Sequence, residues 1–527
     1  MEPNKNETTP TNNTAVNTEK PSAEAAAANT AASAADGKAA PAANAPKAGA
    51  SSQIPKNVLA KPGAVPPKAG AAPMKPGAVP PRPNPNAMGK KRNYHKMMMT
   101  VIDTIKQDYA GFQEKEEIND TKYPMNMIIY AYQKKMINEI LFLRIVSEYL
   151  ASLGDPNLKF SMINHGNYKN NTVGFRARRY GDDLYVTEVG RDDRLKPGDK
   201  ITKLDKYTPA EHRTRIPKNF MVGNTPEREQ WGCFLKMFPS FDVERADGTT
   251  ENMKFRHFII EKPKRKMEFE SLNEKTFYIC IEEFLQNTAD LEKAIEEHAS
   301  ELTFCENLII DLRKNEAGTE PGFVPLLPMI FDSEEELGAL LEKEAIYTNY
   351  SEKNCEHTIK KIENMKERYE KANNADAVAL ADQLIAEFKE KSGKGFLKDV
   401  PEDDLLTEYH EIHEGKEGLY SQIKKVILIT DTWCRDAGEV FVKLCSASDK
   451  VTVVGRPTMG TIDYTNYVNA SIDKTFILSY PMSKRQNVVD GHPYNETGLP
   501  VDVYIPWTPQ ECTEDLLRQK ALELAEG

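Results

Sequence analysis

The sequence of 527 residues has few of the features that mark disulfide-rich, membrane-spanning or secreted proteins. Its seven cysteines have no paired spacing, which indicates reduced thiols rather than a disulfide framework. No apolar run reaches the length of a membrane span, and no apolar core of a signal peptide follows Met1. We therefore expect a soluble, cytoplasmic protein without a transmembrane segment. A misassigned start codon could still hide a signal peptide.

The sequence also lacks the motifs of phosphate and nucleic-acid binding. Its formal net charge of -11 argues against a general nucleic-acid binder. Neither a P-loop nor a dinucleotide fingerprint is present, and no group of residues completes a metal site. We expect no cofactor, no metal and no nucleic-acid partner. The negative charge is uneven, because residues 1–90 carry ten Lys and Arg against five Asp and Glu.

Residues 1–90 are dominated by Ala, Pro, Asn and Lys, and the segment KPGAVPP at 61–67 recurs at 75–81. Such a composition buries too little apolar surface to offset the entropy of the chain. We therefore expect a disordered tail with polyproline character. The segment VPPRP at 79–83 could dock in an aromatic groove of a partner protein, although a soluble spacer is the simpler interpretation.

Residues 91–165 form the next expected unit, and their hydrophobic pattern is helical. Apolar residues recur at steps of three and four, at Met98, Val101, Ile102, Ile105, Ile128, Ile129, Ile137, Ile140, Leu141, Leu143 and Ile145. The pattern ends at Gly154-Asp155-Pro156, a sequence that breaks helices. We expect a small helical unit at this place.

Residues 166–262 have the pattern of short strands separated by turns rich in Gly and Asp, with strands at 172–177, 183–189 and 200–204. The segment LKPGDKI at 195–201 resembles the GD-x-I signature of PDZ domains, and Val173-Gly174-Phe175 resembles their carboxylate-binding loop. The resemblance implies a module in which backbone N–H groups hold the C-terminus of a peptide while the peptide adds a strand to the sheet. A small β-module that only packs is the alternative.

Residues 263–527 have the pattern of an α/β core. Near-continuous apolar runs are typical of strands in a sheet covered on both faces, and they occur at 276–281, 307–312, 426–430 and 451–455. Helical patterns alternate with them, notably at 291–301 and 440–446. A charged insertion at about 334–420 contains amphipathic segments at 334–344, 358–371 and 376–390. We expect this insertion to be a helical lid or interaction arm.

Four motifs of the core resemble the tail-specific (C-terminal-processing) serine peptidases. Leu308–Gly318 is similar to their LIIDLR-x-N-x-G-G, Cys434–Glu439 lies where they have a Ser-containing turn ending in Glu, Val453–Gly460 is similar to VVG-x-P-T-x-G, and Gly498–Pro506 resembles the closing G-x-x-P-D-x-x-V. The resemblance covers residues 95–525. It implies an α/β core of the tail-specific peptidase type with an N-terminal helical unit, a PDZ-like β-module and a helical insertion. It also implies that the partners are peptide or protein C-termini.

The positions at which that family places its catalytic groups hold other residues here. The nucleophile position, three residues before Glu439, is Asp436. The position of the family's lysine base is Thr461, and the position of the histidine used by other members is Asn157. The first glycine of the pair that can offer an oxyanion-hole N–H is also replaced. The oxyanion-hole region would comprise Ala317, Gly318 and Ala437.

These replacements change the chemistry that the turn can perform. A carboxylate at position 436 is a poor nucleophile for an amide, and its charge opposes a developing oxyanion. We interpret Asp436 as the N-cap of the next helix, in a capping box with Glu439. Cys434 is a weaker candidate, because a thiolate at a helix N-terminus would have a lowered pKa but free cysteines are more often buried and inert.

Two functions therefore stay open. The first is a pseudopeptidase that binds peptide or protein C-termini around Val173-Gly174-Phe175 without cutting them. The alternative is an active serine-type or Cys434-dependent endopeptidase that acts on unstructured C-terminal tails. A hydroxyl or thiol paired with Lys or His in the cleft would discriminate between them. The sequence assigns no such pair and does not decide the oligomeric state.

Overall fold

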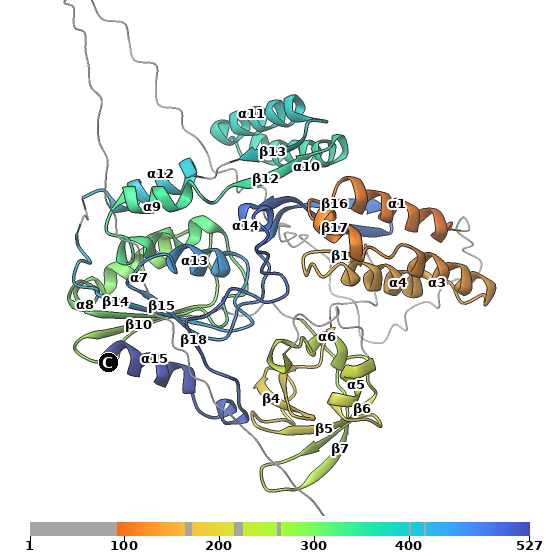
Figure 1. Cartoon of the computed structure of the whole chain (residues 1–527), viewed down its shortest axis with the longest axis horizontal. Helices are drawn as coiled ribbons and strands as arrows, with labels where there is room; N and C mark the ends of the chain where they lie inside the picture. The colour runs from red at the N-terminus through yellow and green to blue at the C-terminus, as the bar shows by residue number, and fades with distance from the viewer. Residues whose placement is uncertain (1–91, 164–170, 216–224, 261–264, 400–401, 416–417) are drawn as a thin grey trace, which may run out of the picture. The chain divides into compact units, whose positions relative to one another are not determined.

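The computed structural model describes residues 92–527, apart from 164–170, 216–224, 261–264, 400–401 and 416–417 (Figure 1). The tail expected at 1–90 lies outside the described residues. Among the described residues, none of the helices combines the length and the apolar character that crossing a bilayer requires.

A six-stranded sheet forms the α/β core, in the order β18-β15-β14-β11-β10-β9. Its strands are β9 (Met267–Ser271), β10 (Thr276–Ile281), β11 (Asn307–Asp311), β14 (Lys425–Thr430), β15 (Val451–Gly455) and β18 (Val503–Tyr504). All neighbours are parallel except the pair β9–β10. The four apolar runs predicted as strands are confirmed, with bounds that differ by one residue at most.

Both faces of this sheet are covered, which explains why its strands are apolar at successive positions. Leu308 and Ile310 of β11 pack on one face in a cluster that includes Phe441 of α13 (Ala437–Cys445). Ile309 packs on the other face with Leu517 of α15 (Leu516–Glu526) (Figure 1). The remaining core helices are α7 (Ala289–Glu297), α8 (Ala299–Phe304), η5 (Glu320–Met329), α14 (Gln486–Val489) and η6 (Pro509–Cys512).

A second sheet contains β1 (Lys159–Met162), β17 (Phe476–Arg485), β12 (Ile346–Tyr350) and β13 (Gly395–Asp399) in that order, and β16 (Tyr464–Ile472) also pairs with β17. Two of these strands, β12 and β13, come from the insertion at 334–420. The insertion was expected to be helical, and it contains helices, but it also contributes these two strands. Register explains the difference, because Ile346, Tyr347 and Thr348 of β12 pair with the end of β17 and are held by the sheet.

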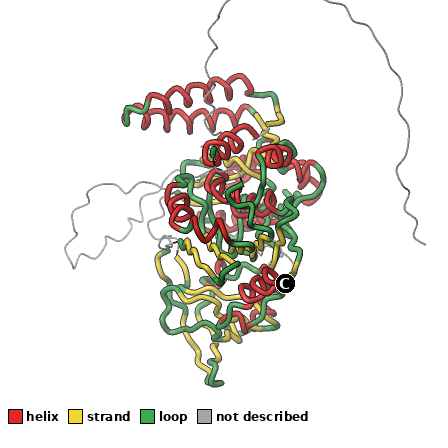
Figure 2. Tube along the Cα trace, turned by 90° about the vertical axis from the view of Figure 1, so that its left-hand side faces the viewer, coloured by secondary structure: helices red, strands yellow, loops and turns green. Residues whose placement is uncertain are grey.

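The insertion also contains α9 (Glu334–Leu341), α10 (Glu352–Lys371), α11 (Ala375–Lys391) and α12 (Glu402–His413). Helices α10 and α11 lie side by side (Figure 2). Ile362 of α10 and Leu384 and Phe388 of α11 are buried in the cluster that also lines the second sheet. The amphipathic patterns of this region thus correspond to helices that pack on that sheet.

The N-terminal part is helical, with α1 (Tyr94–Gln107), α2 (Phe112–Lys115), η2 (Glu116–Ile118), α3 (Lys122–Gln133) and α4 (Glu139–Ser152). The helices end before Gly154, whose φ is +68°. Phe142 of α4 packs against Phe160 of β1 and Phe476 of β17. These helices therefore share a hydrophobic core with the second sheet.

A five-stranded antiparallel sheet lies between these parts in the sequence, in the order β3-β4-β5-β6-β7. Its strands are β3 (Phe175–Tyr180), β4 (Asp183–Val189), β5 (Lys200–Leu204), β6 (Ser240–Glu244) and β7 (Thr250–Lys254). The short elements around it are β2 (Asn171–Thr172), β8 (Phe258–Ile259), α5 (Pro209–Arg215), η4 (Pro226–Arg228) and α6 (Gly232–Leu235). It has a hydrophobic core of its own, centred on Trp231, Phe241 and Val243.

Candidate functional site

The turn between β14 and α13 carries Asp436 in a conformation that few residues adopt. Its φ is 52° and its ψ is -125°. A non-glycine residue in this region is strained, and such strain is common where a sharp strand-to-helix turn presents a reactive side chain. The turn thus has the backbone geometry of a nucleophile-presenting turn, and the side chain that it presents is a carboxylate.

The capping box predicted for Asp436 and Glu439 was wrong. Asp436 stands at the N-cap position of α13, but its side chain accepts no capping hydrogen bond. The physical reason is twofold. The positive φ of Asp436 differs from the extended backbone that a capping side chain needs, and the Glu439 carboxylate is engaged elsewhere.

Glu439 is fully buried and fixes the loop that follows β15. Its Oε1 accepts hydrogen bonds from Thr458 Oγ1 at 2.5 Å and from Gly460 N at 2.6 Å. Its Oε2 accepts from Thr461 N at 2.7 Å and from Thr461 Oγ1 at 2.6 Å. Burial raises the pKa of Glu439, and these hydrogen bonds oppose that effect. Glu439 therefore positions residues 458–461 against the first turn of α13.

The three positions predicted to correspond to the family's catalytic residues are close together in space. Thr461 Oγ1 accepts a hydrogen bond from Asp436 N at 3.0 Å. Asn157 Nδ2 donates to Thr461 O at 2.7 Å and to Tyr464 O at 3.1 Å. Because the Thr461 hydroxyl and the Asn157 amide are both engaged in these bonds, they act as positioning groups. Neither can remove a proton from a nucleophile at neutral pH.

The segment from Asn315 to Gly318 packs against the same turn. Arg435 N donates to Asn315 O at 3.0 Å, and Arg435 Nε donates to Glu316 O at 2.6 Å. A Cβ on Gly438 would lie 2.8 Å from Asn315 Oδ1, so the two segments approach as closely as their atoms allow. Ala317 O accepts from Phe284 N at 3.1 Å. The region expected for an oxyanion hole thus adjoins the first turn of α13, which begins with Ala437.

Cys434 does not have the exposed thiolate that a nucleophile needs. Its side chain is fully buried. Burial raises its pKa well above the ordinary value, and the carboxylates of Glu439 and Asp431 raise it further. A thiol in this environment stays protonated and out of reach of a substrate.

The comparisons with known proteins bear on the part of the chain that holds these residues. Residues 275–505 match the family model of peptidase family S41. This part of the chain belongs to peptidase family S41. A search among curated proteins finds no match for the sequence.

Solved structures resemble the S41 core and much of the remaining chain. Mature CPAF shares 12% sequence identity, with 82% of this chain and 96% of that chain covered and a TM-score of 0.53. A CPAF mutant shares 13% identity over 82% of this chain and 98% of that chain, with a TM-score of 0.52. The photosystem II D1 C-terminal processing protease shares 13% identity over 80% of this chain and 94% of that chain, with a TM-score of 0.40. At these identities, the likeness to CPAF shows the fold alone.

Sequence reasoning missed two side chains on which the charge of Asp436 acts. Lys159 of β1 is solvent-accessible, yet the protein around it desolvates its ammonium group. That desolvation lowers its pKa, as does the charge of Arg435, while Asp436 and Asp155 act in the opposite direction. Burial raises the pKa of Tyr467 of β16, and the charge of Asp436 raises it further. The only sequence signal was that Lys159 follows Asn157 by two residues.

A buried ion network joins β3 to the end of β14. Arg178 donates to both carboxylate oxygens of Asp431, at 3.0 and 3.1 Å, and Arg456 Nη1 donates to Asp431 at 3.1 Å. Although burial opposes it, the charges of Arg178 and Arg456 lower the pKa of Asp431 to about 2. Elsewhere on β3, Arg176 stacks on Trp433 with 4.6 Å between its guanidinium carbon and the ring centroid. The sheet β3–β7 is thereby held against the S41 core.

The loop Val173-Gly174-Phe175 lies at the start of β3, which ends its sheet among the described residues. Gly174 has a φ of +83°, and its carbonyl accepts hydrogen bonds from the N–H groups of residues 190–192 at 2.8 to 3.2 Å. Gly174 N donates to Thr172 Oγ1 at 3.3 Å. Val173 and Phe175 are buried. The two apolar side chains anchor the loop, while its backbone makes a tight, defined turn.

Glu229, which follows η4, links β3 to α5. It accepts from Arg179 Nε and Nη2, each at 2.7 Å, from Arg213 Nε at 3.1 Å and from Trp231 Nε1 at 2.8 Å. The neighbouring Arg228 donates to Met459 O at 3.0 Å in the loop that Glu439 holds. This segment therefore contacts both the β3–β7 sheet and the loop next to Asp436.

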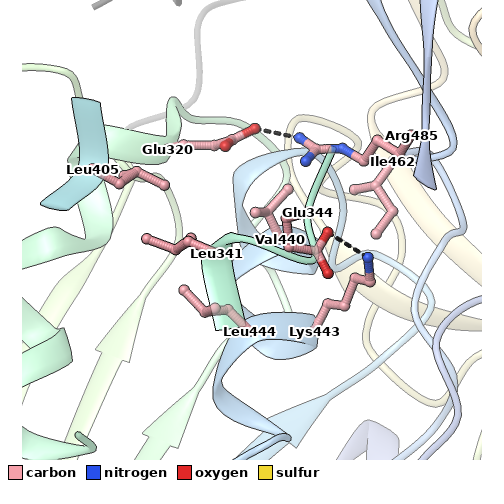
Figure 3. A pocket seen from close by; sticks show the side chains of 9 residues that line it. All are labelled: Glu320, Leu341, Glu344, Leu405, Val440, Lys443, Leu444, Ile462 and Arg485. Atoms are coloured by element: carbon pink, nitrogen blue, oxygen red, sulfur yellow. Dashed lines mark hydrogen bonds and ion pairs between the residues drawn. The ribbon is translucent and has the colours of Figure 1, made fainter. Parts of the chain in front are cut away.

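A small pocket lies beside α13 (Figure 3). Lys443 of α13 pairs with Glu344 at 2.5 Å, and Arg485 at the end of β17 pairs with Glu320 of η5. Leu341, Leu405, Val440, Leu444 and Ile462 complete the lining. The first ion pair ties α13, which directly follows Asp436, to the insertion, and the second ties η5 to the second sheet.

Proposed function

We propose that this chain is a peptidase-like protein that binds the C-termini of peptides or proteins and does not hydrolyse them. The observation that carries the proposal is the turn at Asp436. It keeps the strained backbone of a nucleophile-presenting turn, with φ of 52° and ψ of -125°, but it presents a carboxylate. Retained geometry with replaced chemistry is what we expect of a binding site derived from an active site.

Hydrolysis is disfavoured by the negative charge that Asp436 would place beside the oxyanion. Attack on an amide puts negative charge on the carbonyl oxygen, and stabilising that charge usually contributes more to catalysis than any other single effect. The carboxylate of Asp436, at the start of α13, would oppose it. In addition, the Thr461 hydroxyl is engaged by Glu439 and by Asp436 N, so it is not available to act as a base.

Support for peptide binding comes from β3. This strand ends its sheet among the described residues, so a peptide could pair with its free edge. We assign the peptide-binding role to the loop Val173-Gly174-Phe175, as in a PDZ domain.

Hydrolysis of unstructured C-terminal tails is the alternative, and its Cys434-dependent form is disfavoured by the burial of that thiol. A serine-dependent form would need a serine with a basic neighbour. Ser479 lies opposite Lys159 in the second sheet, but it stands within strand β17 rather than at the strained turn, and its hydroxyl donates to Asn469 Oδ1 at 2.5 Å.

The test is a binding measurement on the full chain by fluorescence anisotropy. Unstructured peptides with apolar C-terminal residues and a free carboxylate serve as probes, and the same peptides with an amidated C-terminus serve as the matched control. We expect saturable binding of the free acids and at least about tenfold weaker binding of the amides, since one lost charge-assisted contact is worth about 1.4 kcal/mol or more. Equal binding of both forms would overturn the proposed role of the loop.

A further inference from the structure

One face of the second sheet carries polar side chains that core packing does not explain. Lys159 of β1 lies opposite Ser479 of β17, and Ser479 lies opposite Asn469 of β16. Tyr467 lies two residues before Asn469, on the same face. The alternate residues Phe160, Val468 and Tyr480 point the other way, into the hydrophobic core. The sheet therefore has one buried face and one polar face that includes Lys159.

This polar face lies next to the turn that carries Asp436. Asn157, two residues before Lys159, donates to Thr461 O at 2.7 Å. Thr461 Oγ1 in turn accepts from Asp436 N at 3.0 Å. A chain of two hydrogen bonds thus connects the start of β1 to the backbone of position 436.

The polar face of the second sheet and the turn that carries Asp436 hold charges of both signs. Arg435 and Asp436 lie on the turn, Asp155 lies in the loop before β1, and Lys159 lies on the sheet. The charge of Arg435 lowers the pKa of Lys159, and the charges of Asp436 and Asp155 raise it. Burial raises the pKa of Tyr467, and the charge of the same Asp436 raises it further. Arg435 is engaged by Glu316 O at 2.6 Å, so Lys159 is the accessible cation of this group.

We propose that Lys159 faces position 436, so that this chain holds a lysine–aspartate charge pair where a peptidase has a hydroxyl and its base, and retains the amine half of such a dyad. The inference deepens the proposed function, on which it rests for the identity of the site. In the native chain the charge of Asp436 opposes the lowering of the Lys159 pKa by burial.

The same placement makes Lys159 a base for a hydroxyl at this position. In the Asp436→Ser variant, the serine oxygen would attack an electrophile while the neutral Lys159 amine takes up its proton. With a fluorophosphonate probe, a bond forms between that oxygen and phosphorus, and fluoride leaves. No oxidant or cofactor is needed for this step.

The first arm of the test follows the titration of Lys159 by NMR in the native chain and in Asp436→Asn. Removal of the carboxylate takes away a charge that favours the ammonium form. We expect the titration midpoint of Lys159 to shift to lower pH in the variant. An unchanged midpoint would overturn the charge pair. This arm needs no active variant, and it requires only that Asp436→Asn be folded, which its NMR spectrum reports.

The second arm measures the rate of fluorophosphonate labelling. General-base assistance contributes at least about 100-fold, so Asp436→Ser should be labelled about 100 times faster than Asp436→Ser with Lys159→Met. The matched control is Asp436→Ser with Lys474→Met, which removes a lysine from the turn between β16 and β17 and should leave the rate unchanged. Equal labelling of all three variants, or labelling of none, would overturn the role of Lys159 as a base. Failure of the native chain to bind peptides would count against the proposed function alone.

Discussion

At the scale of single residues, Asp436 is the position on which most depends. Its backbone is strained, its side chain makes no capping bond, and Glu439 directs its hydrogen bonds to the neighbouring loop. A residue placed there only for stability would relieve the strain rather than keep it. We therefore attribute Asp436 to function, as a carboxylate that the turn presents to a ligand.

The strain at Asp436 predicts the effect of Asp436→Gly. Glycine adopts positive φ without steric conflict, so the folded state should lose a strain of about 1–3 kcal/mol, partly offset by the greater freedom of glycine when unfolded. We expect a net gain of about 1 kcal/mol in the free energy of unfolding, measured with urea. A loss of stability would contradict the claim of strain, because it would show that the Asp436 side chain, with Lys159 facing it, stabilises the fold by more than its backbone conformation costs.

Asp155 gives a prediction about pH. It is buried, it accepts hydrogen bonds from Tyr109 Oη at 2.7 Å and Asn157 N at 2.8 Å, and burial raises its pKa to about 6. Because the folded state holds the proton more tightly than the unfolded state, this group stabilises the fold most below about pH 4, and the contribution is lost as the pH rises through about 6. A shift of about two pKa units corresponds to about 3 kcal/mol.

The measurement compares urea unfolding of the native chain and of Asp155→Asn at pH 4.5 and pH 7. The stability of the native chain relative to Asp155→Asn should be greater at pH 4.5 than at pH 7. A difference that is the same at both pH values would show that the Asp155 carboxyl does not titrate in this range.

At the scale of elements, the close contact between α13 and the segment at Asn315 gives a matched pair of glycine substitutions. Alanine usually stabilises a helix relative to glycine by about 1 kcal/mol. In Gly438→Ala, however, the new Cβ would lie 2.8 Å from Asn315 Oδ1 and 3.1 Å from Cys434 Sγ. We expect this variant to be destabilised by about 1–3 kcal/mol. Gly338→Ala in α9 is the control, because its Cβ would meet Leu406 at an ordinary 3.5 Å, and it should be stabilised. Stabilisation of both variants would contradict the close packing around α13.

The elements also show what the sequence could and could not predict. Apolar runs such as 307–312 and 426–430 are continuous because both faces of their sheet are buried, so they could be recognised as strands. Strands β12 and β13 could not, since their pairing depends on β17, which lies far away in the sequence. Asp436 was interpreted as a helix cap because a positive φ leaves no trace in the residue type. Lys159 was missed because its place on the polar face of the second sheet depends on the pairing of β1 with β17, which lies far away in the sequence.

At the scale of the whole molecule, the buried pairs around Asp431 hold the β3–β7 sheet against the S41 core. Removing one partner of a buried ion pair leaves an uncompensated charge, at about 3–5 kcal/mol. We expect Asp431→Asn to lose about that much stability, since both Arg178 and Arg456 would lose their carboxylate. Hydrogen exchange should show the largest increase at the contacts between β3 and the core. A uniform increase over the chain would mean that the network stabilises the core alone.

The central claim for the whole molecule is that a peptidase fold binds peptides without cutting them. Mass spectrometry of an unstructured peptide with an apolar free C-terminus, incubated with the native chain and with Asp436→Asn, tests it most directly. We predict that the peptide stays intact with both proteins under conditions in which anisotropy shows it to be bound. Turnover of the peptide by the native chain that is lost in Asp436→Asn would contradict the claim, because position 436 would then be catalytic.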